Sequence, residues 1–566
     1  MMAGRIRRDE RGFALATVMI VSLVLSLLAF ATIDYAVGSQ SISRHDQNWN
    51  AALAAAEAGI DDYIFHLNEN GNYWLYNASN LPSDGNKAFV QYVPVPGSTT
   101  NAKFRYSVDA SQIAQSGIVA LTSTGRVGNA ARSVRVTLRR ASFLDYLYFT
   151  DFETTDPASY SGTPFTAAQA QTYCAKYYYG GINNQRDEPS RTDFSGDSDS
   201  NGAYCNDISF VGSDKLNGPM HTNDAFMVCG NAQFLGHVTT SWSGAGGALY
   251  RDGCPTSHPV FADPGGPTYS APLTMPPTNS ALKSNVAAGT GGCLYTGPTR
   301  IKLLSNGQMT VKSPFSKNTN NTTAGQCPKN GTGSMPADGV IYVQNVPSTT
   351  TDPNYTNGCP YSVSNGGGDN RAHPLGLPIH NDTTTYGCRN GDAFIEGTLK
   401  GQLTIASENN IDITWSMTYN SGVGGNDLLG LIANNYIEVY HPTSCTSGTT
   451  SACNLTATFP GETPARTTAN TSPTIQAAML SLSHSVRVQN YDRGAPLGTL
   501  NVTGVLAQRY RGPVGTNSNG TIVTGFSKNY VYDQRLQYLS PPYFLDPVAS
   551  QWGIVTWAEN QVPAGY

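Results

Sequence analysis

Charged residues are scarce in this chain. Aspartate, glutamate, lysine and arginine make up 13% of its 566 residues, about half of the roughly 25% found in an average soluble domain. Glycine (58) and proline (33) are abundant instead, which favours strands and turns and argues against a mostly helical cytosolic enzyme. The formal net charge of −5 gives no basic footprint, so we expect no nucleic-acid partner. The 31 tyrosines and 19 phenylalanines argue against disorder, and the length predicts two or three folded units.

Cysteine is missing from the first part of the chain, and no two cysteines have the CxxC spacing that is typical of zinc sites. The even number of ten suits up to five disulfides in an oxidising compartment, with buried free thiols as the alternative. Pairing between sequence neighbours would close loops of about 10 to 35 residues, and each bridge would contribute about 3 kcal/mol. The candidates are Cys174, Cys205, Cys229, Cys254, Cys293, Cys327, Cys359, Cys388, Cys445 and Cys453.

Catalytic motifs are also missing. The nine histidines form no HExxH, and neither a GxSxG nor a P-loop occurs, so we predict that the protein is not an enzyme. The enzymatic alternative is a membrane-anchored, carbohydrate-active β-helix that uses clustered carboxylates. Asp412 and Glu438 occupy equivalent positions between apolar residues of two similar segments, and we expect both to point outward into solvent.

One acidic run resembles a calcium loop. Asp197, Asp199 and Asn201 place oxygen ligands at positions 1, 3 and 5, and a glycine follows at position 6. Position 12 is Ile208 where an EF-hand has glutamate, although Asp207 lies one residue before it. The sequence predicts either a weak calcium site, with calcium as the only cofactor, or a plain solvated turn.

The N-terminus carries the most specific signal. A leader of 12 residues contains Arg5, Arg7, Arg8 and Arg11, and residues 13–33 then form an uncharged stretch of 21 residues. About 20 apolar residues in a helix span a bilayer, and a basic leader stays on the cytoplasmic side. We therefore expect a single pass through the cytoplasmic membrane, with the rest of the chain outside.

A cleaved signal peptide would end in a loop, but the helical pattern continues beyond residue 33. Apolar residues recur at three- and four-residue steps, which predicts one helix over residues 13–67 whose second half has an apolar stripe. The stripe consists of Trp49, Leu53, Ala56, Ile60, Tyr63 and Leu67.

Gly12 followed by Phe13, the uncharged stretch, and the Ala-Glu-Ala-Gly run that ends at Gly59 together resemble a type IV prepilin. The closest subtype is the PilX-like minor pilins and tip pseudopilins. The resemblance implies that a prepilin peptidase cuts between Gly12 and Phe13 and that the new terminus is methylated. It also implies that other pilin subunits contact the N-terminal helix. Thr17 stands at the fifth mature position, where major pilins have glutamate, and this departure favours a low-copy subunit at the tip.

The remaining sequence predicts an α+β pilin module followed by an all-β module. Alternating segments indicate a small antiparallel head sheet over residues 68–140. Residues 141–566 would form a grafted extracellular module with disulfide-stapled loops and a C-terminal aromatic cap. Residues 404–413 and 430–439 align at an offset of 26, and both have an Asn pair at a corner where we expect positive φ. This repeat favours a parallel β-helix, and the alternative is an antiparallel sandwich.

The predicted function is that of a minor pilin of a bacterial cell-surface filament, placed at its tip, that presents an adhesive or recognition module. The ligand would be a surface, a glycan or a partner protein. The alternative is a tip pseudopilin that primes a secretion or DNA-uptake pseudopilus.

Overall fold

The computed structural model of the chain divides into two compact units. One comprises Met1–Ser111, Ile118–Arg139 and Trp552–Tyr566, and the other Gln112–Gly117 and Arg140–Gln551. The structure describes residues 11–113, 117–159, 207–244, 248–254, 257–358, 389–441, 472–518, 521–548 and 551–561, with the short pieces 168, 170–171, 174, 178, 205, 375, 443–445 and 453–455.

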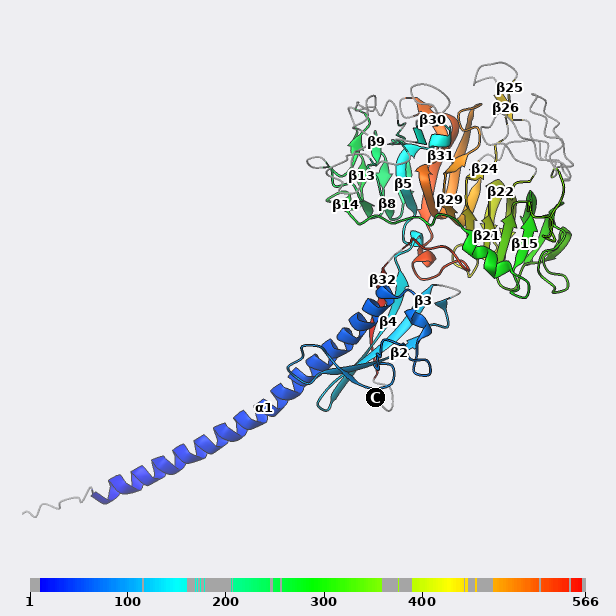
Figure 1. Ribbon diagram of the computed structural model, residues 1–566. Helices are drawn as coiled ribbons and strands as arrows, with labels where there is room; N and C mark the ends of the chain where they lie inside the picture. Colours follow the sequence, from blue (N-terminus) through cyan, green and yellow to red (C-terminus); the bar gives the residue numbers. More distant parts are fainter. Residues whose placement is uncertain are drawn as a thin grey trace, which may run out of the picture. The chain divides into compact units, whose positions relative to one another are not determined.

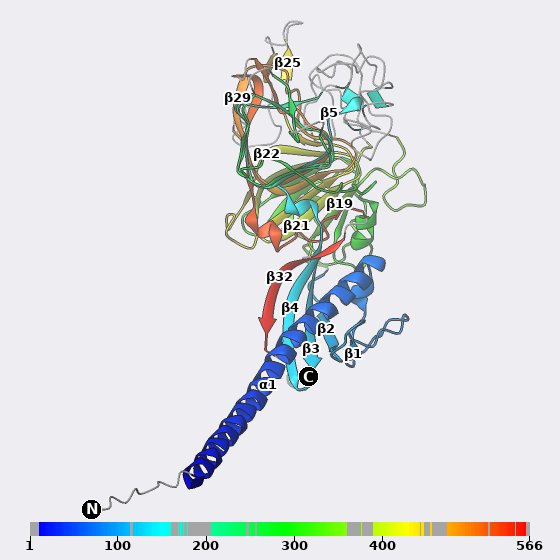
Figure 2. The same ribbon diagram turned by 90° about the vertical axis from the view of Figure 1, so that its left-hand side faces the viewer.

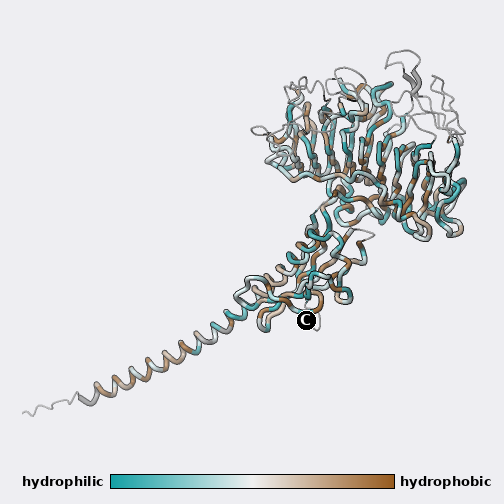
Figure 3. Tube along the Cα trace, viewed as in Figure 1, coloured by the Kyte–Doolittle hydropathy of each residue, from teal (hydrophilic) through white to brown (hydrophobic). Residues whose placement is uncertain are grey.

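The first unit is built on one helix, α1 (Arg11–Glu69), which is 59 residues long and extends two residues beyond the predicted helix at each end. The segment contains no proline, so no turn of the helix lacks a backbone donor. Its first half is almost entirely apolar, as the brown tube in Figure 3 shows, and its second half packs against a sheet (Figure 1).

The sheet of this unit has five strands in the order β1-β2-β3-β4-β32. Neighbouring strands from β1 to β4 pair antiparallel. The strands are β1 (Val93–Pro94), β2 (Lys103–Asp109), β3 (Ile118–Val127), β4 (Ala130–Arg140) and β32 (Trp552–Asn560), and a short 3₁₀ turn, η1 (Tyr73–Leu75), follows the helix.

Strand β32 corrects the predicted domain boundary, because the end of the chain belongs to the head and not to the module at residues 141–566. Figure 2 shows β32 beside β4. Arg132 on β4 donates twice to the Glu559 carboxylate at 2.7 Å, and the Thr556 hydroxyl donates to Thr137 Oγ1 at 2.7 Å. Without β32, β4 would be a bare sheet edge. The head is therefore incomplete at residue 140, and the module is an insertion between two strands of one sheet.

The second unit is a large all-β structure in which 22 of the described strands form one sheet with mostly parallel pairing. Its first strands are β5 (Tyr148–Thr155), β6 (Ser209–Val211), β7 (Lys215–Asn217), β8 (Met220–Thr222), β9 (Met227–Cys229), β10 (Gln233–Phe234), β11 (Val238–Thr240), β12 (Arg251–Asp252), β13 (Val260–Phe261) and β14 (Thr268–Tyr269). They are followed by β15 (Cys293–Thr296), β16 (Thr299–Leu303), β17 (Gln308–Lys312), β18 (Asn330–Ser334), β19 (Val340–Gln344), β20 (Ala393–Leu399), β21 (Gln402–Ser407), β22 (Ile411–Tyr419), β23 (Leu428–Ala433) and β24 (Ile437–Val439). The last are β25 (Thr443–Cys445), β26 (Cys453–Leu455), β27 (Thr474–Ser481), β28 (Val486–Val488), β29 (Pro496–Arg511), β30 (Gly515–Ser518) and β31 (Thr521–Tyr532). Short 3₁₀ turns are η2 (Phe143–Asp145), η3 (Pro157–Ser159), η6 (Ser280–Val286) and η8 (Gln534–Gln537).

Three parallel ladders organise this unit. The first runs β15-β19-β21-β23-β27-β29-β5-β8-β11-β14. The second runs β16-β20-β22-β24-β28. The third runs from the end of β22 through β27, β29, β31, β7 and β10 to β13. Each turn of the chain thus adds strands to several ladders, and the antiparallel sandwich is excluded as the main architecture of the described strands.

The 26-residue alignment is confirmed by the pairing, because Thr404 is the register partner of Gly430 and Ile413 that of Val439. The physical reason given for the corner asparagines is wrong, since Asn409 and Asn435 do not have positive φ. Their side chains stack instead: Asn435 Nδ2 donates to Asn409 Oδ1, and the Asn435 backbone N–H donates to the Asn409 carbonyl at 3.0 Å. Successive corners are joined by this stacked pairing.

The chain enters the first ladder in its middle. Strand β5, the first of the module, lies between β8 and β29, so the beginning and the end of the insertion are neighbours (Figure 1). From β14 the chain returns to β15 at the opposite end of the ladder through η6. Asn279 on this return segment donates to the carbonyls of Ser407 at 2.7 Å and Ile432 at 3.1 Å, which ties the segment to two strands.

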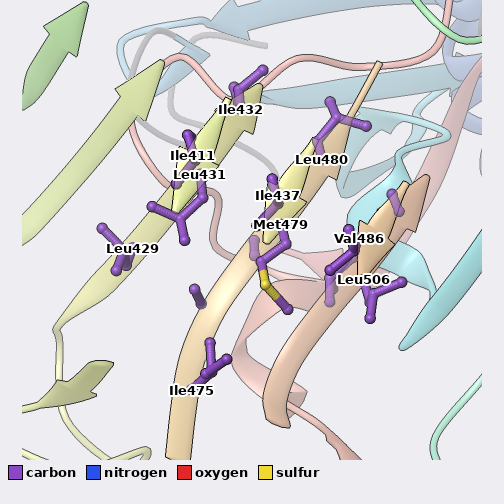
Figure 4. Close-up of a cluster of buried hydrophobic side chains, with 14 of the residues drawn as sticks. Ile411, Leu429, Leu431, Ile432, Ile437, Ile475, Met479, Leu480, Val486 and Leu506 are labelled. Atoms are coloured by element: carbon purple, nitrogen blue, oxygen red, sulfur yellow. The ribbon is translucent and has the colours of Figure 1, made fainter. Parts of the chain in front are cut away.

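The aromatic C-terminal segment is not an end cap, which corrects another expectation. Tyr530 and Tyr532 lie within β31 and point into the core. Phe544 lies 3.0 Å from the position of a Cβ added at Gly430 in the middle of the first ladder, and so covers the face of the sheet. The core of the module contains both aliphatic and aromatic side chains, and Figure 4 shows an aliphatic part of it around Leu431 and Met479.

Candidate filament helix and recognition module

The apolar half of α1 has no covering partner among the described residues. Its large side chains from Leu15 to Ile33 are all exposed, for example Phe30 at 72%. By length and composition this helix could cross a membrane, and none of its most apolar stretch is buried. A helix that is apolar all round is stable only in lipid or among other apolar helices. The exposed half therefore requires a second environment outside this chain.

The predicted processing residues lie at the start of this half. Gly12 and Phe13 are in the first turn of α1, and their side chains lie outside the described residues. The side chain of Thr17 is exposed with the apolar ones, and the helix has no acidic residue before Asp34. The cleavage between Gly12 and Phe13 stays a prediction.

The second half of α1 packs closely on the head sheet, as the stripe predicts. Ile60, Tyr63 and Leu67 are buried. The contact depends on a glycine whose role no local pattern indicates: a Cβ added at Gly125 on β3 would lie 2.0 Å from the carbonyl oxygen of Ala52. Backbone atoms of α1 and β3 are in contact at this point, and this contact fixes the distance between the helix and the sheet.

Trp49 departs from the predicted stripe. It is 44% exposed, and the Arg132 guanidinium lies 5.2 Å from its ring centroid. The position of the ring between helix and strand edge suits a cation–π contact, worth about 0.5–1 kcal/mol at an exposed site. Trp49 therefore belongs to the rim of the helix–sheet contact.

A polar cluster fixes the chain that follows α1. The Tyr106 hydroxyl donates to Asp62 Oδ2 at 3.1 Å, and Asn86 Nδ2 donates to the hydroxyls of Tyr106 at 2.6 Å and Tyr73 at 3.1 Å. Burial, together with the nearby Asp62 carboxylate, raises the pKa of Tyr106 well above its ordinary value. The phenol stays neutral and acts as a structural donor.

The two carboxylates of the enzymatic alternative are not solvated, which corrects the prediction. Asp412 and Glu438 are buried on neighbouring strands β22 and β24. Glu438 Oε1 accepts from Arg487 Nε at 2.7 Å, and the same guanidinium lies 4.0 Å from the ring centroid of Tyr436. A buried carboxylate needs such a partner, because desolvation of an unpaired charge is costly.

A third acid in this region was missed by the sequence reading. Burial raises the pKa of Asp392 to about 7, and the nearby Glu438 adds to this effect, while donation from Asn409 and from the Asn410 backbone opposes it. Its Oδ2 has no hydrogen-bond partner among the described residues, so no donor on that side stabilises the charged form. Pattern alone gave no signal, since Asp392 precedes a strand and resembles a turn residue.

Most of the predicted calcium loop cannot be placed. Asp197, Asp199 and Asn201 lie outside the described residues. Asp207, offered as the fourth ligand, is buried and forms an ion pair with Arg251. No group of three or more histidine, cysteine or acidic side chains in the described part of the chain could hold a metal ion. The calcium loop stays a prediction.

Six cysteines form three disulfides between sequence neighbours. The bridges are Cys174–Cys205, Cys229–Cys254 and Cys293–Cys327, with separations of 31, 25 and 34 residues. Cys359 and Cys388 lie outside the described residues. Cys445 and Cys453 are register partners in the hairpin β25–β26, and their side chains are outside the described set.

Two buried ion pairs lie where the first and last strands of the module meet, and sequence reasoning did not find them. Arg511 Nη1 donates to Glu153 Oε2 at 2.8 Å, and Lys528 Nζ donates to Asp214 Oδ2 at 2.8 Å. The Arg511 guanidinium lies 3.5 Å from the ring centroid of Phe210. All these partners are far apart in sequence, so no local pattern pairs them.

Residues 11–61 match the family model of the PilX N-terminal region. The N-terminal segment of the chain is similar to that of type IV minor pilins. The match covers the leader's end and most of α1, and it does not reach the module. No curated protein matches the chain. Among solved structures, the competence-associated pilin ComZ from Thermus thermophilus is similar at 13% identity, covering 91% of this chain and 97% of ComZ, with a TM-score of 0.26.

The similarity to minor pilins extends into both halves of α1. The matched segment contains the uncovered apolar half of α1 and most of the half that packs on the head sheet. The buried half of α1 packs on the head sheet. The module is inserted in the chain between strands β4 and β32 of that sheet.

Proposed function

We propose that this protein is a minor subunit of a bacterial type IV filament that presents its inserted module at the filament tip. The supporting observation is the uncovered apolar half of α1 within a segment that matches the PilX N-terminal model. Before assembly, that half would anchor the chain in the cytoplasmic membrane with the module outside. In the filament, helices of other pilin subunits would cover it.

Tip placement rests on Thr17. A carboxylate at this position is costly to bury unless the amine of a neighbouring subunit neutralises it. Thr17 carries no carboxylate, so a subunit with Thr17 needs no such neighbour above it. We further propose that the module is a parallel β-helix, because three parallel ladders are extended by successive turns of the chain. The protein would act by binding and not by catalysis, in keeping with the pairing of Glu438 to Arg487.

The decisive test of the subunit role is processing. Co-expression with a prepilin peptidase should give a mature chain that begins at Phe13, and Gly12→Leu should block cleavage. The control is Gly38→Leu, which should be cleaved normally because a Cβ added at Gly38 meets no atom within 4 Å. Intact-mass spectrometry reads out all three chains. Cleavage beyond residue 30 would show a secretory signal peptide and contradict the proposal.

The runner-up is a pseudopilin that primes assembly. A deletion strain that keeps its filaments but loses adherence supports the tip adhesin, and complete loss of filaments supports the priming role. Immunogold labelling of filament ends is expected; labelling along the shaft would contradict tip placement.

A further inference from the structure

The outer surface of the module's third ladder carries side chains that are partly exposed. Along β27, β29 and β31 the inward residues, such as Ile475, Val502 and Tyr530, are buried, and the residues between them are partly exposed. These outward residues carry hydroxyl or amide groups almost throughout. We call the following six the polar face: Thr474, Gln476, Thr499, Asn501, Thr503 and Asn529.

The polar face is periodic because its strands are parallel and in register. Thr474 pairs with Asn501 and Asn501 with Asn529, while Gln476 pairs with Thr503. Neighbouring strands lie about 4.8 Å apart, and alternate residues on a strand about 6.8 Å apart. Asn529 Nδ2 donates to Asn501 Oδ1 at 2.9 Å, which holds both amides in line. The result is a flat lattice of polar groups with fixed spacing.

The chemistry of this lattice is neutral. The Thr503 hydroxyl can both donate and accept, whereas the Asn501 amide already accepts from Asn529 and donates to the Thr499 carbonyl. No acid or arginine occurs among the six. Lys528 on β31 points inward to Asp214, and Lys215 adjoins Asn529 at the rim. A polyanion would need a row of cations, and a protein interface would need an aromatic or methionine core, and the polar face has neither.

We propose that the polar face binds a neutral polysaccharide, whose repeated hydroxyl groups match repeated hydroxyl and amide groups. The proposal rests on the proposed function, since it names the ligand class of the presented module. Each hydrogen bond to such a ligand, direct or through water, replaces one to solvent and is worth little alone. Because the groups repeat over several strands, one polysaccharide chain can form many such hydrogen bonds. Once the first bonds hold the chain, the others form intramolecularly, so the total affinity is much larger than that of one contact.

The test uses the full-length chain in detergent and measures its retention on insoluble cellulose, chitin and α-glucan, with alginate and double-stranded DNA as anionic comparisons. The chain should be retained by at least one neutral polymer and by neither polyanion. Thr503→Glu, which places a charge in the lattice, should lower retention at least tenfold. Thr332→Glu, on an exposed hairpin threonine of the same module, should retain wild-type binding.

Melting curves check that each variant folds, and Thr503→Val, which removes the hydroxyl at constant volume, replaces Thr503→Glu if the latter is unstable. Retention by no neutral polymer, preference for a polyanion, or wild-type retention of both Thr503 variants would overturn the proposal. Because Thr503 is far from α1 in sequence, its variants should still be processed at Phe13 and enter filaments. Loss of glycan binding with intact processing therefore separates this proposal from the subunit role.

Discussion

Adding one methyl group at Gly125 should loosen the pilin head. The Cβ of Gly125→Ala would lie 2.0 Å from the Ala52 carbonyl oxygen and 2.3 Å from the Ala56 amide nitrogen, both of which are backbone atoms of α1. No rotamer change relieves such an overlap, so helix and strand must separate. Overpacking costs about 1–3 kcal/mol where side chains can move, and we expect about 3 kcal/mol here. At Gly59 the clash is mainly with side-chain atoms of Ser123 and Phe104, so Gly59→Ala should cost less.

Hydrogen exchange of the full-length chain in detergent is the suitable assay, because it reports the head separately from the module. A loss of about 3 kcal/mol speeds exchange of protected amides in β3 and in the second half of α1 by about 100-fold. Gly553→Ala is the matched control, because Gly553 lies in the same sheet but a Cβ added there meets no atom within 4 Å. This variant should change the exchange rates little. Equal protection in Gly125→Ala and Gly553→Ala would refute the close helix–strand contact.

Three further predictions concern the module. The raised pKa of Asp392, about 7, means that the folded chain keeps a proton that the unfolded chain loses near pH 4. The contribution of this site to stability should therefore fall by about 3 kcal/mol between pH 4 and 7, and Asp392→Asn should remove that difference in paired melts. Arg511→Met should cost about 3–5 kcal/mol in denaturant unfolding by leaving Glu153 buried without its partner, and adding Glu153→Gln should restore much of the loss; additive costs would contradict the pairing. Replacing Cys229 and Cys254 by serine should cost about 3 kcal/mol by calorimetry, and an unchanged melting temperature would show that this 25-residue bridge is not formed.

The parts predicted well from the sequence are those with local periodicity. The helix and its buried stripe follow from apolar spacing, and the 26-residue repeat was visible because β21 and β23 present the same small and branched residues. Trp49 shows the limit of this logic, since its spacing fits the stripe but an arginine on β4 holds it at the rim.

The features that could not be predicted from the sequence depend on contacts between distant segments. No pattern in residues 552–560 indicates that they complete the sheet that begins before residue 140. The same alternation of residues would suit a strand of either unit. Likewise Glu438 sits between core residues as a solvated acid would, and only Arg487 on the next turn of the chain explains its burial. The raised pKa of Asp392 follows from its burial, which no spacing rule reports.

The position of β32 gives the head a dependence on chain synthesis. Arg132 and Glu559 are 427 residues apart in sequence, so the head sheet cannot close until the ribosome has produced the whole module and β32. Such long-range pairing makes closure a late and slow event in folding. A chain truncated anywhere inside the module keeps α1 but leaves β4 as an open edge. The complete five-stranded head sheet is therefore present only in a chain synthesised at least as far as β32.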